Sequence, residues 1–288
     1  MDIIEKDLTK LSTIRVKSLA KYYCEPANVN DIRKAVEFSS KNNLEIEVLG
    51  NGSNILFSKE TYDRKLFLKL KGEFNFFNEY ENFIEIGAAF YLKLAGKKMI
   101  KMGLKDYVFF HLIPACIGGA IAQNAGTSCD GEIKDVCISV KVIDILNNKI
   151  IDLSNQECLF EYRDSIIKKE KGRFIVLSAK FSKKNKVSNV KQLVSKCRER
   201  MQEKINREPS GYSFGSTFIN NQLPAWECVK RVKKSLDNSR GAFFSEKHAN
   251  WIINQDSNGI DIVNLIKETQ KIVKSELNLE LKTEVRII

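Results

Sequence analysis

The stretch VLGNGSNILF, Val48 to Phe57, places two glycines, two asparagines and a serine between two apolar runs. A simple turn needs only two such residues, so Gly50–Asn54 indicates a backbone that bends tightly and approaches another group closely. Consecutive main-chain N–H groups in such a bend form a concave site for an anion such as a diphosphate. The loop has neither the Lys-Ser/Thr ending of a P-loop nor the spacing of a Rossmann fingerprint. Taken alone, it fits a surface turn as well as a phosphate cradle.

The composition is that of an ordinary soluble globular protein, with 43% hydrophobic and 29% charged residues in a chain of 288. That length allows two domains or one large one with a well-buried core. The sequence starts without a basic-then-apolar leader, and no apolar run approaches the length of a membrane span. We therefore expect a cytoplasmic protein with no membrane partner.

Cysteine and histidine usage bears on redox state and metal binding. The seven cysteines are odd in number and never fall in Cys-x-x-Cys spacing, and only two histidines accompany them. We expect reduced, mostly buried thiols and no metal site. His248 could act as a base, but a packed histidine beside Trp251 is the simpler interpretation.

The net charge is 47 − 36 = +11, and lysine-rich clusters at 168–171 and 230–234 carry much of it. A nucleic-acid binder is one interpretation of this excess. The other is a generally lysine-rich chain whose field attracts anionic small molecules. We favour the second, with no nucleic-acid partner, because no basic stretch is interleaved with aromatic stacking residues.

Hydrophobic periodicity predicts an α+β fold with a larger N-terminal portion. A helix in 28–43 and a strand in 44–50 precede the quoted loop, and a capping box at 154–157 indicates a short helix. Strands are expected in 65–72, 83–90 and 173–182, a helix in 91–102, and a hairpin in 138–153 that turns at Asn147 and Asn148.

The C-terminal portion follows a polar segment, 183–189, that is typical of a domain boundary. After it we expect a helix near 190–201, a loop at 211–218, a helix from Pro224, a strand pair near 243 and 252, and a long helix in 261–277. In the last ten residues Leu279, Leu281, Val285 and Ile287 alternate with charged residues, which predicts a terminal strand.

A second glycine cluster, HLIPACIGGAIAQNAGTSCDGEI at 111–133, combines many small residues with few charges. Such density permits the close approach of a flat or extended ligand, although tight packing of irregular loops also explains it.

Three polar residues stand in informative settings. Arg163 could clamp a carboxylate or phosphate, or pair with a neighbouring acid. Ser216 follows a glycine between two phenylalanines, where a turn is the simpler interpretation. Glu284 shares the polar face of the terminal strand with Arg286, where a surface ion pair is the default.

In combination these pieces resemble the UDP-N-acetylenolpyruvoylglucosamine reductase family, from about Leu11 to Ile288 and in the family's order. The motifs that carry the resemblance are Gly50-Asn51-Gly52-Ser53-Asn54, Ile113-Pro114 through Gly118-Gly119, Asn124-Ala125-Gly126, Gly131-Glu132, Tyr162-Arg163-Asp164-Ser165, Gly215-Ser216-Thr217-Phe218, Ser245-x-Lys247-His248-Ala249 and Glu284-Val285-Arg286. Each is weak singly, but together and in order they are a strong signal.

The resemblance implies a fold and a reaction. The fold is the FAD-binding type of the PCMH and vanillyl-alcohol-oxidase proteins, with FAD-binding subdomains at 1–66 and 67–184 and a substrate domain at 185–288. The final strand, 279–288, would return toward the flavin site. The short span between Arg163 and Ser216 is similar to the type II branch. The reaction uses non-covalent FAD and NADPH to reduce UDP-N-acetylglucosamine enolpyruvate to UDP-N-acetylmuramate, and we expect a monomer.

By resemblance, Arg163 would stabilise the developing enolate, Ser216 would donate a proton, and Glu284 would lie at the same group with a raised pKa. The residues expected to bind the cofactor are Gly50, Asn51, Gly52, Ser53, Asn54, Ile113, Pro114, Ala115, Gly118, Gly119, Asn124, Gly126 and Arg286. Those expected at the substrate are Tyr162 and Asn220.

The chain departs from the family pattern at four places. Lys17-Ser18 replaces a Gly-Gly pair, Ala115 replaces a glycine, a Gln-Pro after the basic helix is absent, and Ile219–Gln222 lacks a proline. We therefore assign no diphosphate-binding arginine. Two alternatives stay open. One is a paralogous flavin oxidoreductase on the same scaffold that acts on a different nucleotide sugar or small substrate, with His111 or Cys116 as candidates for covalent flavin attachment. The other is a nucleotide- or RNA-binding protein without flavin.

Overall fold

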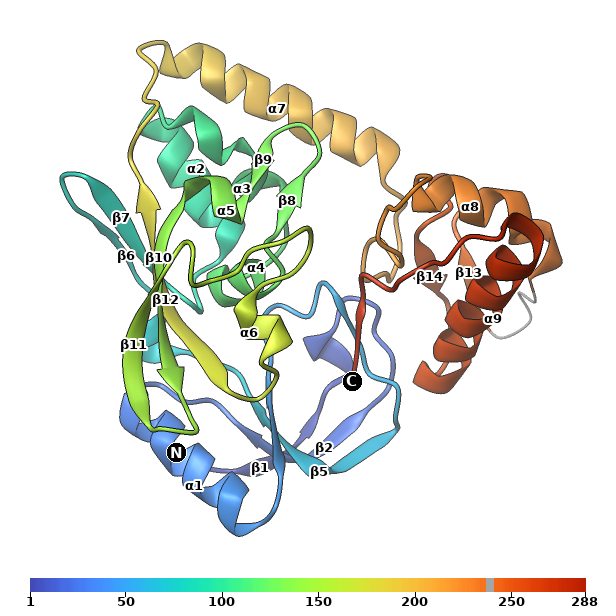
Figure 1. Ribbon diagram of the computed structural model, residues 1–288, viewed down its shortest axis with the longest axis horizontal. Helices are drawn as coiled ribbons and strands as arrows, with labels where there is room; N and C mark the ends of the chain where they lie inside the picture. The colour runs from blue at the N-terminus through green and yellow to red at the C-terminus, as the bar shows by residue number, and fades with distance from the viewer. Residues whose placement is uncertain (237–240) are drawn as a thin grey trace. The chain divides into compact units, whose positions relative to one another are not determined.

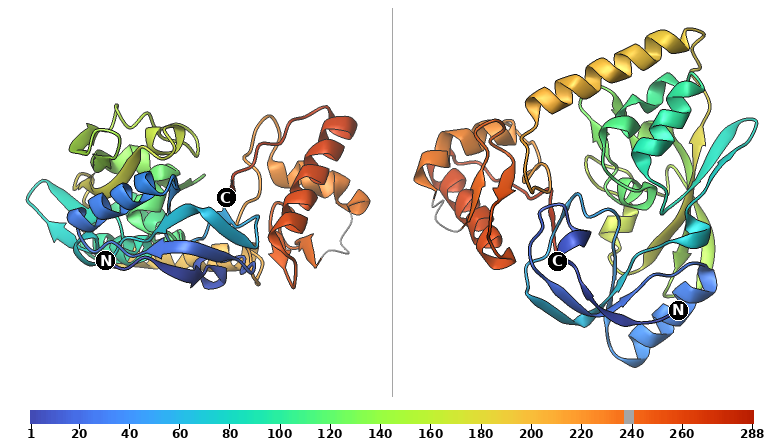
Figure 2. Two further views of the ribbon diagram at one scale, coloured as in Figure 1. Left: turned by 90° about the horizontal axis from the view of Figure 1, so that it is seen from below. Right: turned by 180° about the vertical axis from the view of Figure 1, so that it is seen from behind.

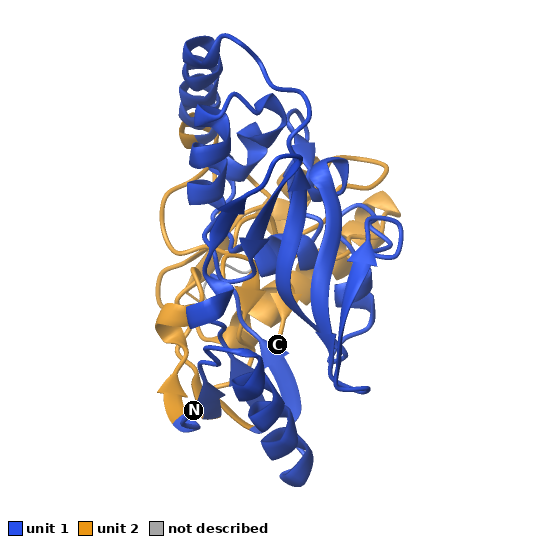
Figure 3. Ribbon diagram, turned by 90° about the vertical axis from the view of Figure 1, so that its left-hand side faces the viewer, with its two compact units in different colours: residues 1–4, 22–51, 64–204 blue, residues 5–21, 52–63, 205–288 orange. Residues whose placement is uncertain are grey.

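A computed structural model describes residues 1–236 and 241–288. The chain divides into two compact units, coloured separately in Figure 3. Unit 1 contains residues 1–4, 22–51 and 64–204, and unit 2 contains residues 5–21, 52–63 and 205–288. One of the boundaries between the units falls between Asn51 and Gly52, inside the first glycine loop. The three-part division predicted from the sequence stays a prediction.

The strands and helices appear in chain order in Figure 1. The strands are β1 (Ile4–Asp7), β2 (Leu19–Cys24), β3 (Glu45–Val48), β4 (Ile55–Leu56), β5 (Thr61–Leu68), β6 (Phe77–Glu79), β7 (Phe83–Gly87), β8 (Gly126–Thr127), β9 (Gly131–Glu132), β10 (Cys137–Asp144), β11 (Lys149–Ser154), β12 (Phe174–Ser182), β13 (Ala242–Phe244), β14 (Ile252–Asn254) and β15 (Arg286–Ile287). The α-helices are α1 (Val29–Lys41), α2 (Leu92–Lys101), α3 (Val108–Leu112), α4 (Ile117–Ala122), α5 (Ile133–Val136), α6 (Ile166–Lys169), α7 (Val190–Arg207), α8 (Ala225–Val232) and α9 (Gly259–Leu277). Short 3-10 turns are η1 (Thr9–Leu11), η2 (Gly72–Phe74), η3 (Lys105–Tyr107) and η4 (Lys233–Ser235).

Unit 1 is built on a five-stranded sheet of order β11-β10-β12-β7-β6, whose paired strands are all antiparallel. Successive residues of β12 point to opposite faces, so Val176 packs in one core and Ile175 and Leu177 in another. The first core includes apolar residues of α2, α3 and α4, and the second includes Ile32 and Ala35 of α1. Both faces of the sheet are therefore covered.

A second sheet has the order β1-β2-β5-β3, in which β3 and β5 are parallel. The strands β2 and β5 each continue from one unit into the other. Helix α1 begins where the periodicity predicts, because the Asn28 side chain accepts the Asp31 N–H at 2.9 Å.

Unit 2 packs α8 and α9 with the β13–β14 hairpin around one apolar cluster. Figure 2 shows the backbone of these elements, coloured orange to red, in two further views. Phe214 and Phe218, which flank the Ser216 turn, lie in this cluster and are 1% exposed. Strand β15 pairs in parallel with β4, directly after the first glycine loop. No helix in the described ranges is long and apolar enough to cross a membrane.

Most elements expected from periodicity are confirmed, and two expectations are wrong. The capping box at Ser154 forms, with Ser154 N–H donating to Glu157 Oε2 at 2.8 Å, but only a turn follows it. Leu159 adopts φ +45°, a left-handed conformation that ends the turn before a helix can propagate.

The terminal strand is also shorter than expected. Only Arg286 and Ile287 are in strand conformation, and Ile287 is exposed whereas Ile288 is buried. The alternation fails because the segment changes partner. It bridges first to Phe218 through Thr283 and then pairs with Ile55.

Candidate functional site

Steric constraints at Gly52 explain part of the first glycine loop. Its φ is +66°, and a Cβ added there would lie 1.8 Å from the main-chain oxygen of Leu11. The Gly52 oxygen in turn accepts the Thr13 N–H at 3.0 Å. Only glycine satisfies both the dihedral angle and the close approach.

The next main-chain donors of this loop point to anion binding. Within 1–236 and 241–288, the N–H groups of Gly52, Ser53 and Asn54 have no hydrogen-bond acceptor. Gly52 is buried and the other two residues are half-buried. Three adjacent N–H groups without an acceptor fit the diphosphate of FAD better than they fit a simple surface turn.

In unit 1, the Cys116 thiol links the start of this loop to the second glycine stretch. A Cβ on Gly119 would lie 3.7 Å from Cys116 Sγ. A Cβ on Gly50 would lie 2.8 Å from the same sulfur. Gly50 and Gly119, both expected at the cofactor, therefore lie close to one buried thiol, and Asn51 follows Gly50 directly in the chain.

The second glycine stretch forms helix α4, whose first N–H groups are already satisfied. Ile117 N–H donates to Phe90 O at 3.0 Å, and Gly118 N–H donates to Ala88 O at 2.9 Å. Ala115, which replaces the family's glycine, accepts the Leu92 N–H at 2.9 Å through its main-chain oxygen. The N–H groups of Ile117 and Gly118 are therefore not available to a ligand. Ile113 and Pro114 precede it, half-buried and exposed respectively.

Arg163 is fixed by its own unit. It stands at the tip of a tight turn with φ +58°, a left-handed conformation that is uncommon for arginine. Its Nη2 donates to Gly126 O at 2.8 Å, and its Nη1 lies 3.9 Å from the Glu132 carboxylate. These partners lie more than thirty positions away in the sequence, and the pairing expected with a neighbouring acid stays a prediction. Its carbon Cζ also lies 4.8 Å from the ring centroid of Tyr162, which is half exposed.

Asn124 has structural partners in its own unit. It is fully buried, its Nδ2 donates to Glu161 O at 2.8 Å, and its Oδ1 accepts the Lys134 N–H at 3.0 Å. Both ends of the side chain therefore hold the turn that carries Arg163 against α5. Its expected contact with the cofactor stays a prediction.

In unit 2, Ser216 and Glu284 become neighbours although they are far apart in sequence. Glu284 N–H donates to the main-chain oxygen of Thr217 at 2.8 Å. Ser216 is half-buried after Gly215, whose φ is +86°. Glu284 is also half-buried, and its surface ion pair with Arg286 stays a prediction.

The end of the first glycine loop joins the same arrangement. Asn54 Nδ2 donates to Glu284 O at 3.1 Å, and the Asn54 oxygen accepts the Arg286 N–H at 3.1 Å. One asparagine therefore fixes the backbone on both sides of Val285. The sequence-predicted residues Ser216, Glu284, Arg286 and Asn54 lie in one continuous hydrogen-bonded segment of unit 2.

Two other candidates have structural partners. Asn220 Oδ1 accepts the Ala225 N–H at 2.9 Å, which caps the start of α8, so one of its lone pairs is already used. His248 lies 6.1 Å from the Trp251 ring, and burial together with the nearby Arg207 lowers its pKa. These contacts confirm the interpretation of His248 as a packed residue.

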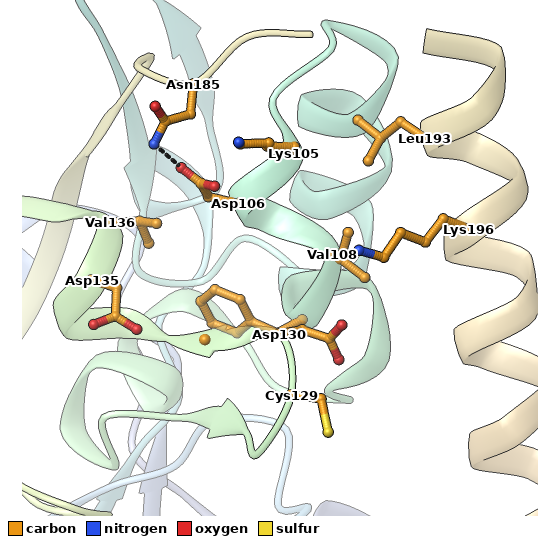
Figure 4. A pocket seen from close by; sticks show the side chains of 12 residues that line it. Lys105, Asp106, Val108, Cys129, Asp130, Asp135, Val136, Asn185, Leu193 and Lys196 are labelled. Carbon is orange, nitrogen blue, oxygen red and sulfur yellow. Dashed lines mark hydrogen bonds between the residues drawn. The ribbon is translucent and has the colours of Figure 1, made fainter. Parts of the chain in front are cut away.

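A cavity of about 430 Å³ lies elsewhere in unit 1, between α7 and the β8–β9 hairpin (Figure 4). Lys105 and Lys196 reach it, but its carboxylates have other partners. Asp130 is paired with Arg200 at 2.8 Å, and Asp106 accepts from Asn185 at 2.7 Å. None of the residues predicted for the site lines this cavity.

Known families match both parts of the chain. Residues 20–154 match the FAD binding domain, and residues 205–288 match the C-terminal domain of UDP-N-acetylenolpyruvoylglucosamine reductase. The reductase of Carboxydothermus hydrogenoformans is 31% identical over 98% of this chain and 92% of that protein. The chain belongs to the UDP-N-acetylenolpyruvoylglucosamine reductase family. The family resemblance predicted from the motifs is thereby confirmed.

Other members agree with this assignment. The reductase of Caldanaerobacter subterraneus is also 31% identical, over 99% of this chain and 93% of that protein. The crystal structure of the reductase from Thermus caldophilus matches with a TM-score of 0.81 and 24% identity, covering 100% of this chain and 99% of that chain. The predicted α+β fold, with an FAD-binding part and the family's C-terminal domain, is confirmed.

Proposed function

We propose that this chain catalyses the NADPH-driven reduction of UDP-N-acetylglucosamine enolpyruvate to UDP-N-acetylmuramate, an oxidoreductase step of peptidoglycan precursor synthesis. Similarity to the family's reductases over 98% of the chain supports the reaction. The observation that carries the assignment of residues is the 2.8 Å hydrogen bond from Glu284 N–H to Thr217 O, which sets Glu284 beside Ser216.

The cofactor is non-covalent FAD, and the residues fit it. The N–H groups of Gly52, Ser53 and Asn54 would hold the diphosphate, and Arg286, whose backbone is tied to Asn54, would face the flavin. A bound flavin supplies the hydride chemistry, which no side chain provides. In the second glycine stretch Gly118 would contribute a close contact, since its N–H is already bonded to Ala88 O.

Arg163 is the group proposed to stabilise developing negative charge. Addition of hydride to the methylene carbon of an enolpyruvyl ether moves electron density toward the adjacent carboxylate. A guanidinium held by Gly126 O and Glu132 costs little reorganisation when that charge develops. Its positive φ indicates that the surrounding structure holds the residue in place at some conformational cost.

Ser216 is the proposed proton donor. The intermediate is strongly basic at the carbon next to the carboxylate, so even a hydroxyl can protonate it. Glu284, one hydrogen bond away along the backbone, would bind the same end of the substrate. Tyr162 and Asn220 remain proposed substrate contacts.

The alternative is a paralogous flavin oxidoreductase that acts on a different nucleotide sugar or small substrate, such as an oxidase with covalently attached flavin, for which Cys116 is a candidate link. Burial raises the pKa of this thiol, and its sulfur packs closely against the backbone of Gly50. Attachment needs a reactive thiolate, which this setting disfavours. Denatured protein that stayed yellow in the polypeptide fraction would support the alternative.

The deciding experiment is NADPH oxidation by the purified protein with and without UDP-N-acetylglucosamine enolpyruvate. We expect substrate-dependent turnover, and Ser216→Ala should reduce it by about 10²- to 10⁴-fold. Flavin bleaching by NADPH should persist in that variant. The exposed Ser210→Ala serves as the matched control. Normal turnover in Ser216→Ala would eliminate the proton-donor role, and a wild type inert toward this substrate would eliminate the reaction.

The setting of the reaction is also part of the proposal. We place the protein in the cytoplasm, where NADPH and nucleotide sugars are made and where its seven free cysteines stay reduced. We propose a monomer whose partners are these two small molecules and neither nucleic acid nor membrane. A single sedimenting species of about 33 kDa is the result expected from the chain mass of 32.9 kDa.

A further inference from the structure

We propose that Asn250 is a positioning residue that sets the place of Ser216 relative to Glu284. The inference rests on the proposed function of these two residues. Asn250 follows the motif residues His248 and Ala249 but was not singled out from the sequence. It is 3% exposed, so its hydrogen bonds have little competition from water.

The side chain of Asn250 binds the residue two positions after Ser216. Its Oδ1 accepts the Phe218 N–H at 3.0 Å, and its Nδ2 donates to Phe218 O at 2.9 Å. A primary amide offers one donor and one acceptor side by side, as a peptide group in a neighbouring strand does. Asn250 therefore replaces a strand partner at a place where the chain forms only isolated bridges.

The main chain of Asn250 binds the residue directly after Ser216. Its oxygen accepts the Thr217 N–H at 2.8 Å, and on the other side Thr217 O accepts the Glu284 N–H at 2.8 Å. The two peptide groups that flank Thr217 are thus held, one by Asn250 and the other by Glu284. A change at Asn250 displaces the Ser216 hydroxyl and its register with Glu284 together.

Asn254 provides a matched control in the same unit. It is 6% exposed, its Nδ2 donates to Ile14 O at 2.8 Å, and its Oδ1 accepts the Ser257 N–H at 2.8 Å. Its side chain makes the same number and kind of bonds, but to segments that contain neither Ser216 nor Glu284. Loss of stability alone should therefore be similar in the two variants.

The test compares Asn250→Asp with Asn254→Asp in the flavin-loaded protein. In each variant a carboxylate oxygen replaces the amide nitrogen and faces a carbonyl oxygen. We expect reoxidation of the reduced enzyme by the enolpyruvyl substrate to slow by about 10- to 100-fold in Asn250→Asp, since misplacement by about 1 Å costs up to 10² in rate. The rate of flavin reduction by NADPH should change by less than about twofold in both variants. In Asn250→Asp the fold-change in KM should be smaller than the fold-change in kcat.

A second measurement does not depend on turnover. Hydrogen exchange should accelerate at the Glu284 and Phe218 amides in Asn250→Asp and stay at the wild-type rate in Asn254→Asp. Equal rates of reoxidation and equal exchange in the two variants would overturn the proposal. If Asn250→Asp does not fold, Asn250→Ala and Asn254→Ala, which leave room for water, decide in the same way. A wild type without turnover would refute the proposed function, while the exchange comparison would still decide the role of Asn250.

Discussion

Replacement of Gly52 by alanine tests the reason for the first glycine loop. Gly52 has φ +66°, a conformation that costs an L-residue about 1–2 kcal/mol. The added methyl would also lie 1.8 Å from Leu11 O, a main-chain atom that cannot rotate away. Forced backbone shifts of this kind cost about 1–3 kcal/mol more. We therefore expect Gly52→Ala to lose about 2–5 kcal/mol of unfolding free energy.

Gly172→Ala separates the cost of the left-handed backbone conformation from the cost of the steric clash. Gly172 has φ +79°, but no atom lies within 4 Å of the position of its added methyl. This variant should lose only the conformational part, about 1–2 kcal/mol. Urea unfolding followed by tryptophan fluorescence measures both variants, and FAD titration measures cofactor affinity, which should fall only in Gly52→Ala. If Gly52→Ala unfolds no earlier than Gly172→Ala and binds FAD normally, the close approach to Leu11 is not what the loop requires.

Two further predictions concern unit 1. Arg163→Lys keeps the charge but loses the planar fork that reaches Gly126 O, so kcat/KM should fall by about 10²-fold with little change in melting temperature. Asp130→Asn should destabilise the protein by about 1–3 kcal/mol near neutral pH, because it removes the ion pair with Arg200. Burial raises the pKa of the Asp130 carboxyl, but the hydrogen bonds from Arg200 lower it by more, so the net pKa lies below the usual value of an aspartate. That stabilisation is present above pH 3.8 and is lost as pH falls through the folded-state pKa, so thermal melts of mutant and wild type should converge in acid.

Local patterns in the sequence were sufficient for the regular elements. Helix α1 carries its own N-cap at Asn28, and the hairpin turn carries Asn148 with φ +52°, so short-range chemistry decides both. The capping box at Ser154 shows the limit of such patterns. The cap forms, but Leu159, which is 52% exposed, adopts a left-handed conformation that ends the turn, and no local pattern indicates this.

The site was predictable as a set of motifs and not as a geometry. Family motifs identified Arg163, Ser216 and Glu284, but nothing local indicates that Glu284 N–H bonds to Thr217 O. The role of Asn250 is equally long-range, since its side chain binds a residue more than thirty positions earlier. Such contacts follow from the topology of unit 2, which periodicity does not encode.

The two glycine stretches differ in a way that only the structure reveals, and this difference makes a final prediction. In α4 the N–H groups of Ile117 and Gly118 are bonded to main-chain oxygens, whereas those of Gly52, Ser53 and Asn54 have no acceptor in the described part of the chain. Amide exchange should therefore be slow at α4 with or without FAD.

At the first loop, exchange should be fast without the cofactor and slow with it, because a diphosphate would accept from those three donors. Hydrogen exchange of peptides that cover 50–56 and 116–122, measured with and without FAD, shows which of the two glycine stretches the diphosphate protects. Adenosine, which lacks the diphosphate, is the control and should not protect residues 50–56. Protection that appears only at α4 would assign the diphosphate to the second stretch and remove the physical reason for the first.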